Sequence, residues 1–170
     1  MTVNRGPYRS GFTLIELVVG MLVLAIALVM ISSMLFPQAD RSSETLHRVR
    51  SAELAQAVMN EIWGKRYDQH TNPVNGKPCG GPGQAACSAV LGPEGETRQQ
   101  YNDVDDYNGM TQAALMLNST QTYADVYPNY QLLVTISGAG ADNSVSKLIT
   151  IVVTTPFGEK IAFDAVRSNF

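Results

Sequence analysis

The longest uninterrupted run of apolar residues lies near the amino terminus of the chain. From Leu17 to Ile31 no side chain carries a charge, and the apolar stretch that starts at Phe12 is about 20 residues long. An α-helix of this length crosses a hydrocarbon layer about 30 Å thick, because each residue adds about 1.5 Å to its length. The pattern predicts a membrane-spanning helix over residues 12–36.

A second apolar pattern, with the spacing of an amphipathic helix, follows in residues 37–64. Its apolar residues recur at every fourth position, at Leu54, Val58 and Ile62. Pro37 stands between the two patterns and cannot donate a backbone hydrogen bond, so we expect a kink or break of the helix just before it. The amphipathic half should pack on a globular domain.

Three later stretches rich in β-branched residues predict strands at residues 130–137, 147–155 and 160–166. The short connections between them indicate an antiparallel meander. A helical turn is expected at residues 112–117. The predicted fold class is therefore α+β, with a long amino-terminal helix packed on a small antiparallel sheet inside a globular domain of residues 65–170.

The charge distribution orients the predicted helix and excludes one class of partner. Residues 1–11 contain Arg5 and Arg9 and no acidic residue, which predicts a cytoplasmic amino terminus and a periplasmic globular domain. The chain has a net charge of −3 and lacks the basic cluster that nucleic-acid binding needs. A cleaved secretory signal and an unprocessed single-span anchor are alternative interpretations of this amino-terminal segment.

One acidic residue, Glu16, lies within the first turns of the apolar helix. An isolated carboxylate at membrane depth costs about 2.5–3.5 kcal/mol, so it indicates a functional site and needs a partner. A free α-amine on an adjacent helix would supply that partner. The alternative is a carboxylate at the membrane edge that reaches the headgroups and has no further role.

The hexapeptide Gly-Phe-Thr-Leu-Ile-Glu, from Gly11 to Glu16, resembles the processing site of type IV pilins and type II secretion pseudopilins. The resemblance implies that residues 1–11 are a prepilin leader peptide. A prepilin peptidase would cut between Gly11 and Phe12, and a methyltransferase activity would then N-methylate Phe12. The resemblance also implies that Glu16 faces the amino terminus of a neighbouring pilin subunit during assembly.

Cys79 and Cys87 are the only cysteines, and they lie in a stretch dense in glycine and proline that predicts an irregular loop. In an oxidising compartment we expect a disulfide between them that closes this loop. Metal ligation is the alternative, with His47 and His70 as the two available histidines, but the spacing matches no zinc motif.

Three acidic residues, Asp103, Asp105 and Asp106, lie close together in the following segment. Their carboxylates could gather around calcium, although their spacing departs from the EF-hand pattern. The interpretation that we favour is a solvated, turn-forming loop without a metal. We expect no other cofactor.

The sequence contains no phosphate-binding loop, nucleophile elbow or paired zinc-ligand motif, so we expect no enzymatic activity. The cysteine loop, residues 91–98 and residues 103–107 resemble the minor pilin D family of the mannose-sensitive haemagglutinin pilus. This resemblance implies a minor pilin that inserts in the inner membrane and then joins a pilus filament at the cell surface, supporting pilus biogenesis and adhesion. The alternative is a minor pseudopilin of a type II secretion system.

Overall fold

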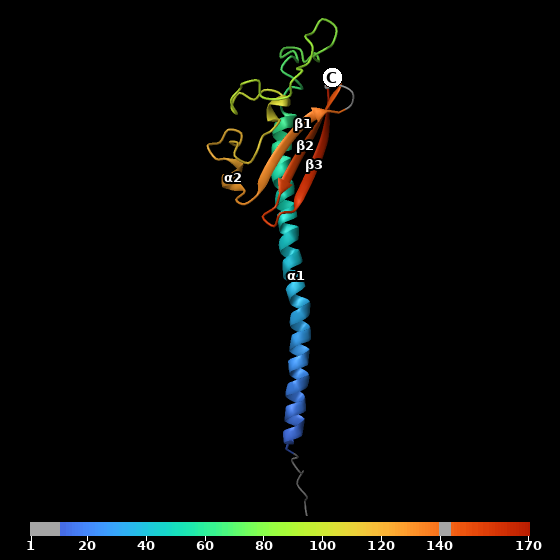
Figure 1. Cartoon of the computed structure of the whole chain (residues 1–170), viewed down its shortest axis with the longest axis vertical. Helices are drawn as coiled ribbons and strands as arrows, with labels where there is room; N and C mark the ends of the chain where they lie inside the picture. The colour runs from blue at the N-terminus through green and yellow to red at the C-terminus, as the bar shows by residue number, and fades with distance from the viewer. Residues whose placement is uncertain (1–10, 140–143) are drawn as a thin grey trace, which may run out of the picture. The chain divides into compact units, whose positions relative to one another are not determined.

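The computed structural model describes residues 11–139 and 144–170, and of residues 35–42 only the backbone. The elements in chain order are α1 (Leu14–Trp63), the short 3-10 helix η1 (Asp105–Tyr107), α2 (Tyr123–Val126), β1 (Gln131–Gly138), β2 (Ser146–Thr154) and β3 (Lys160–Ser168) (Figure 1). The chain divides into two compact units, Met1–Glu44 and Thr45–Phe170, and α1 contributes to both.

α1 is a continuous helix from Leu14 to Trp63, so the break predicted just before Pro37 is not observed. Pro37 removes one backbone donor, whose acceptor in a regular helix is the carbonyl of Ser33. The hydroxyl of Ser33 donates to the carbonyl of Met30 at 2.8 Å, which adds a hydrogen bond in the preceding turn. The helix continues on both sides of Pro37 all the same, in keeping with the tolerance of apolar helices for proline.

The three predicted strands form an antiparallel sheet in the order β1–β2–β3, which confirms the α+β fold class. Ile136 of β1 lies opposite Ile149 of β2, and Ile151 of β2 lies opposite Phe163 of β3. Side chains of β1 and β2 alternate between buried and more exposed positions, as expected for strands with one face on a core. β3 is an edge strand with no fully buried residue.

The core of the Thr45–Phe170 unit lies between the sheet and one stripe of α1 (Figure 1). The predicted helix stripe of Leu54, Val58 and Ile62 is completely buried. The sheet contributes its inward-facing apolar side chains, which are Leu132, Val134, Ile136, Ile149, Ile151 and Val153. Burying one such side chain contributes about 1.5–3 kcal/mol. The segment between helix and sheet adds further buried residues to this core, among them Val104 and Tyr107.

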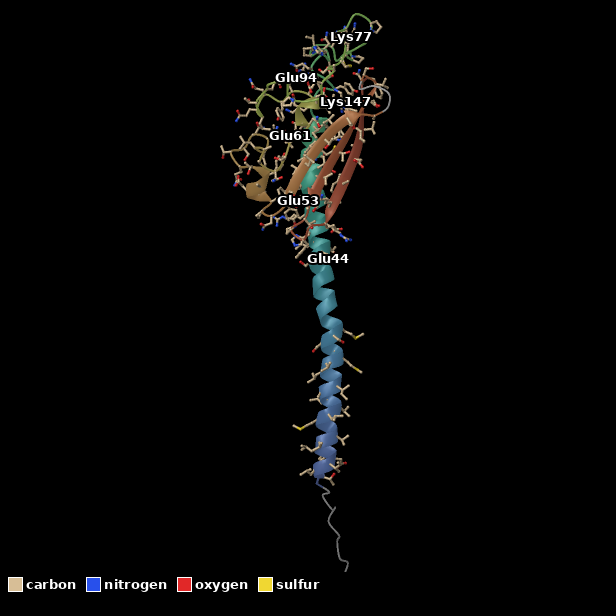
Figure 2. The ribbon with its side chains drawn as sticks, viewed as in Figure 1. Glu44, Glu53, Glu61, Lys77, Glu94 and Lys147 are labelled. Carbon is tan, nitrogen blue, oxygen red and sulfur yellow. A yellow bond between two sulfur atoms is a disulfide. The ribbon has the colours of Figure 1, made fainter. Side chains whose placement is uncertain are left out.

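A buried acid on α1, Glu61, fastens the segment before the sheet to the helix (Figure 2). Its carboxylate forms an ion pair with Arg98 at 2.6 Å and accepts hydrogen bonds from the hydroxyls of Tyr107 at 2.7 Å and Tyr123 at 3.0 Å. Burial and the charge of Glu61 raise the pKa of both tyrosines, so they remain donors. No local sequence pattern joins these four residues, so only the folded chain reveals the cluster.

The helical turn predicted at residues 112–117 is wrong, because that segment forms turns and a bridge between Leu115 and Thr122. The single turn α2 follows instead. A capping box satisfies two backbone N–H groups at its start. The Thr122 N–H donates to the Asp125 carboxylate at 2.8 Å, and the Asp125 N–H donates to the Thr122 hydroxyl at 3.2 Å. The capping residues, and not the apolar spacing, decide where this helix begins.

Substitution of the helix stripe tests the assignment of the core. Leu54→Ala should lower the free energy of unfolding by about 2–5 kcal/mol, because it leaves a cavity at a fully buried position. Leu46→Ala, at an exposed position of the same helix, is the matched control and should change it by no more than about 0.5 kcal/mol. Urea unfolding of the full chain in detergent micelles, followed by the fluorescence of Trp63, measures both. Equal effects of the two substitutions would contradict this packing.

Candidate functional site

The amino-terminal motif lies at the start of α1. Gly11 and Phe12 precede the helix and are exposed, and an added carbon at Gly11 would meet no atom within 4 Å. The rest of the predicted leader peptide, residues 1–10, lies outside the described residues. The bond between Gly11 and Phe12 is therefore accessible in the described part of the chain.

Glu16 caps the helix on which it lies. Its Oε2 accepts hydrogen bonds from the backbone N–H and the hydroxyl of Thr13, both at 3.1 Å, and the Glu16 N–H donates to the Thr13 hydroxyl at 3.3 Å. This is a capping box, which satisfies backbone donors that a helix start otherwise leaves open. Within the described residues Oε1 of Glu16 has no hydrogen-bond partner. The Thr-x-x-Glu spacing of residues 13–16 is the sequence signal that could have predicted this capping box.

The helix that follows is apolar around its whole circumference. Leu14–Met34 has a mean hydropathy of 2.9, and no part of this segment is buried by the described chain. It is the one helix among the described residues that is long and apolar enough to cross a membrane. A helix that is apolar on all sides must be covered by lipid or by other protein.

In the Thr45–Phe170 unit, Cys79 and Cys87 are joined by a disulfide with a Cα–Cα distance of 4.9 Å. The side-chain amide of Asn169 donates to the carbonyl of Cys79 at 3.0 Å and to that of Ser144 at 2.6 Å. The disulfide loop is thereby attached to the end of the chain. Because both sulfurs are bonded to each other, neither acts as a thiolate ligand for a metal.

A buried lysine lies at the start of β2, on the same face as the core isoleucines (Figure 2). The ammonium of Lys147 donates to Asp68 at 3.0 Å, to Asp105 at 2.7 Å and to the carbonyl of Tyr67 at 2.9 Å. Burial raises the pKa of Asp68, but hydrogen bonds from His70 and Lys147 outweigh it and hold this pKa below its usual value. All three charged side chains are fully buried. Asp105, one of the three predicted calcium ligands, thus has a lysine as its partner.

The other two predicted ligands, Asp103 and Asp106, come together with Glu94, which sequence reasoning did not identify. Each of the three offers a carboxylate oxygen, and these atoms lie within 4.8 Å of one another. We call these three residues the Glu94 cluster. Asp103 and Asp106 are buried and Glu94 is exposed. Glu94 lies several residues before the aspartates, so only the folded loop reveals the group.

The burial of Asp103 makes stability depend on pH. Burial, and secondly the charge of Asp106, raise the pKa of Asp103 from 3.8 to about 6. The folded state therefore holds the proton of the Asp103 carboxyl more tightly than the unfolded chain does. As a result, the contribution of Asp103 to the free energy of unfolding falls as pH rises from about 4 to about 6. Asp103→Asn removes this decline, so the variant should gain stability relative to the wild type over that window. Urea unfolding at several pH values in chelator-treated buffer measures it, and parallel curves would contradict the assignment.

Comparison with protein-family models matches residues 7–32 to the prokaryotic N-terminal methylation motif. Neither the curated proteins nor the solved structures gave a match. The matched segment contains Gly11, Phe12 and Glu16 together with most of the apolar part of α1. Prepilin peptidases recognise this motif, and the proteins that carry it are structural subunits of filaments. The motif at residues 7–32 therefore indicates a prepilin of the type IV pilin or pseudopilin type.

Proposed function

We propose that the protein is a minor pilin that is cleaved after Gly11 and assembled into a type IV pilus through α1. The observation that carries this proposal is the helical segment Leu14–Met34. The described chain leaves its apolar side chains uncovered, and most of the segment belongs to the methylation motif at residues 7–32. Such a surface suits a subunit that is held in the inner membrane and afterwards surrounded by other subunits.

Assembly exchanges one apolar environment for another. Lipid chains are as apolar as leucine side chains, so transfer of Leu14–Met34 from the bilayer into a filament costs little. Close packing and polar contacts then select the arrangement of subunits. The Thr45–Phe170 unit, on the periplasmic side before assembly, would be carried to the outside of the filament.

Glu16 has the position and chemistry to select that arrangement. The capping box uses Oε2 and fixes the carboxylate at the start of the helix, while Oε1 is open for a partner outside the described chain. Cleavage after Gly11 creates an α-amine at Phe12, and N-methylation keeps its positive charge. An ion pair between this amine and Glu16 of a neighbouring subunit satisfies two charges that are costly in an apolar setting.

The choice of a pilus over a secretion filament rests on similarity of the middle segments to the minor pilin D family. These segments are the disulfide loop of Cys79 and Cys87, residues 91–98 and residues 103–107. In this interpretation the Thr45–Phe170 unit supports pilus biogenesis and adhesion and has no catalytic role. If a deletion strain loses its surface pili and secretes proteins normally, the protein is a pilus subunit. If the strain keeps its pili and loses secretion, the protein is a subunit of the secretion filament.

Processing is tested by substitution at the cleavage site. Gly11→Leu places a bulky side chain beside the bond to be cut, so the full-length chain should accumulate in the inner membrane and be absent from sheared filaments. Mass spectrometry of wild-type filaments should give a subunit that begins at N-methylated Phe12. Gly20→Ala is the control and should be processed normally, since open space surrounds that position. Any other mature amino terminus contradicts the proposal.

The role of Glu16 is tested by Glu16→Gln, which keeps an oxygen for the capping box but removes the charge. Membrane insertion and cleavage should be unchanged, because the apolar helix and the Gly11–Phe12 bond are intact. Incorporation into filaments should fall at least about tenfold, since losing one member of a buried charge pair costs about 2–5 kcal/mol. Quantitative immunoblots of sheared filaments measure it. Glu44→Gln, another acid of α1, is the matched control; incorporation of Glu16→Gln equal to that of this control would refute the charge pair.

A further inference from the structure

We propose that Glu94, Asp103 and Asp106 form a calcium-binding site in the loop segment that precedes the sheet. This site lies within the Thr45–Phe170 unit and does not depend on the proposed role in a pilus. Glu94 and Lys147 are both labelled in Figure 2, at the end of this unit where the loops gather.

The distances between the three carboxylate oxygens suit a shared cation. The three carboxylate oxygens lie within 4.8 Å of one another. Calcium binds oxygen at about 2.3–2.6 Å, so two oxygens on one ion are separated by no more than about 5 Å. The spacing of the three oxygens is therefore compatible with binding of one calcium ion.

Two buried carboxylate oxygens of the Glu94 cluster have no hydrogen-bond partner among the described residues. Oδ2 of Asp106 accepts the N–H groups of Asn102 at 2.7 Å and Asp103 at 3.0 Å, and Oδ1 of Asp103 accepts the N–H of Asp105 at 2.8 Å. The other oxygens, Oδ2 of Asp103 and Oδ1 of Asp106, are buried and have no hydrogen-bond partner among the described residues. Leaving a buried charged acceptor unsatisfied is costly. A cation at these oxygens removes that cost.

The nearby cationic side chains do not neutralise the Glu94 cluster. The ammonium of Lys147 lies against Asp68 and Asp105, so it is already shared between two acids. The guanidinium of Arg66 donates to the neutral oxygens of Gln69, Thr71 and Asn102. Glu94 is repelled by Asp106 and Asp68 and also by Glu96, whose Oε2 is a further buried oxygen without a partner. The cluster is thus an excess of negative charge that a divalent cation would neutralise.

The chemistry of the donors selects the cation. All three ligands are carboxylates, which suit hard cations and not zinc or copper. Magnesium usually binds one or two carboxylates, keeps several waters and demands near-octahedral geometry, whereas calcium accepts six to eight oxygens in irregular arrangements. Three carboxylates from an irregular loop, with water completing the shell, therefore fit calcium. The exposed position of Glu94 gives the ion a route to the two buried aspartates.

Isothermal titration of the full chain in detergent micelles, after removal of metals with a chelator, tests the site with calcium chloride as the probe. We expect one site with a dissociation constant of about 10⁻⁴ to 10⁻³ M, the range of extracellular calcium modules, and a rise in the thermal unfolding temperature that excess EGTA reverses. Magnesium chloride should bind at least about tenfold more weakly.

Glu94→Gln is the informative variant, because this side chain is exposed and its loss leaves the buried core intact. Calcium affinity should fall at least about tenfold, while the far-ultraviolet circular dichroism stays that of the wild type. Glu44→Gln removes one carboxylate from the other compact unit and should bind calcium as the wild type does. The proposal is overturned if about 5 mM calcium gives neither heat nor a thermal shift, if magnesium binds equally well, or if Glu94→Gln retains full affinity.

Discussion

An α-helix with apolar side chains on every side has no stable place in water, and this constraint governs the protein. Over Leu14–Met34 the described chain covers none of that surface. In the proposed function lipid covers this surface first, and other apolar helices then replace the lipid at little cost. An apolar medium also makes an unsatisfied backbone N–H at a helix start costly. The capping box of Thr13 and Glu16 satisfies two such N–H groups. Glu16 thus completes the helix, and in the proposed function its carboxylate also meets a partner on a neighbouring subunit.

The carboxyl-terminal part of α1 meets a different requirement. There a single stripe is apolar, and the inward faces of β1 and β2 cover it. Three strands and part of one helix make a small core, and the irregular segment before the sheet adds six buried residues to it, which are Val104, Tyr107, Met110, Tyr123, Tyr127 and Tyr130. Polar contacts hold this segment as well: Glu61 binds Arg98 and two tyrosines, Lys147 binds two aspartates, and a disulfide closes the loop.

Patterns that are local in the sequence predicted the fold well. The fourfold spacing of Leu54, Val58 and Ile62 and the alternation within the strands are direct consequences of helix and strand geometry. The contact of Lys147 with Asp68 and Asp105 joins three distant segments, and no local pattern contains it. The alternation places Lys147 on the buried face of β2, which could have signalled a buried charge. The Thr-x-x-Glu spacing at the motif was a readable signal that remained unused.

One rule accounts for both groups of buried acids in the loop segment. A buried carboxylate needs donors or a cation for each oxygen, or else it keeps its proton. Asp68 meets this rule through Lys147 and backbone N–H groups, whereas Asp103 and Asp106 have backbone donors for one oxygen each. The calcium ion that we propose would satisfy their remaining oxygens. Such an ion would link the order of this segment to the calcium concentration around it. The segment would then be held by this ion together with its buried apolar side chains, such as Val104 and Tyr107.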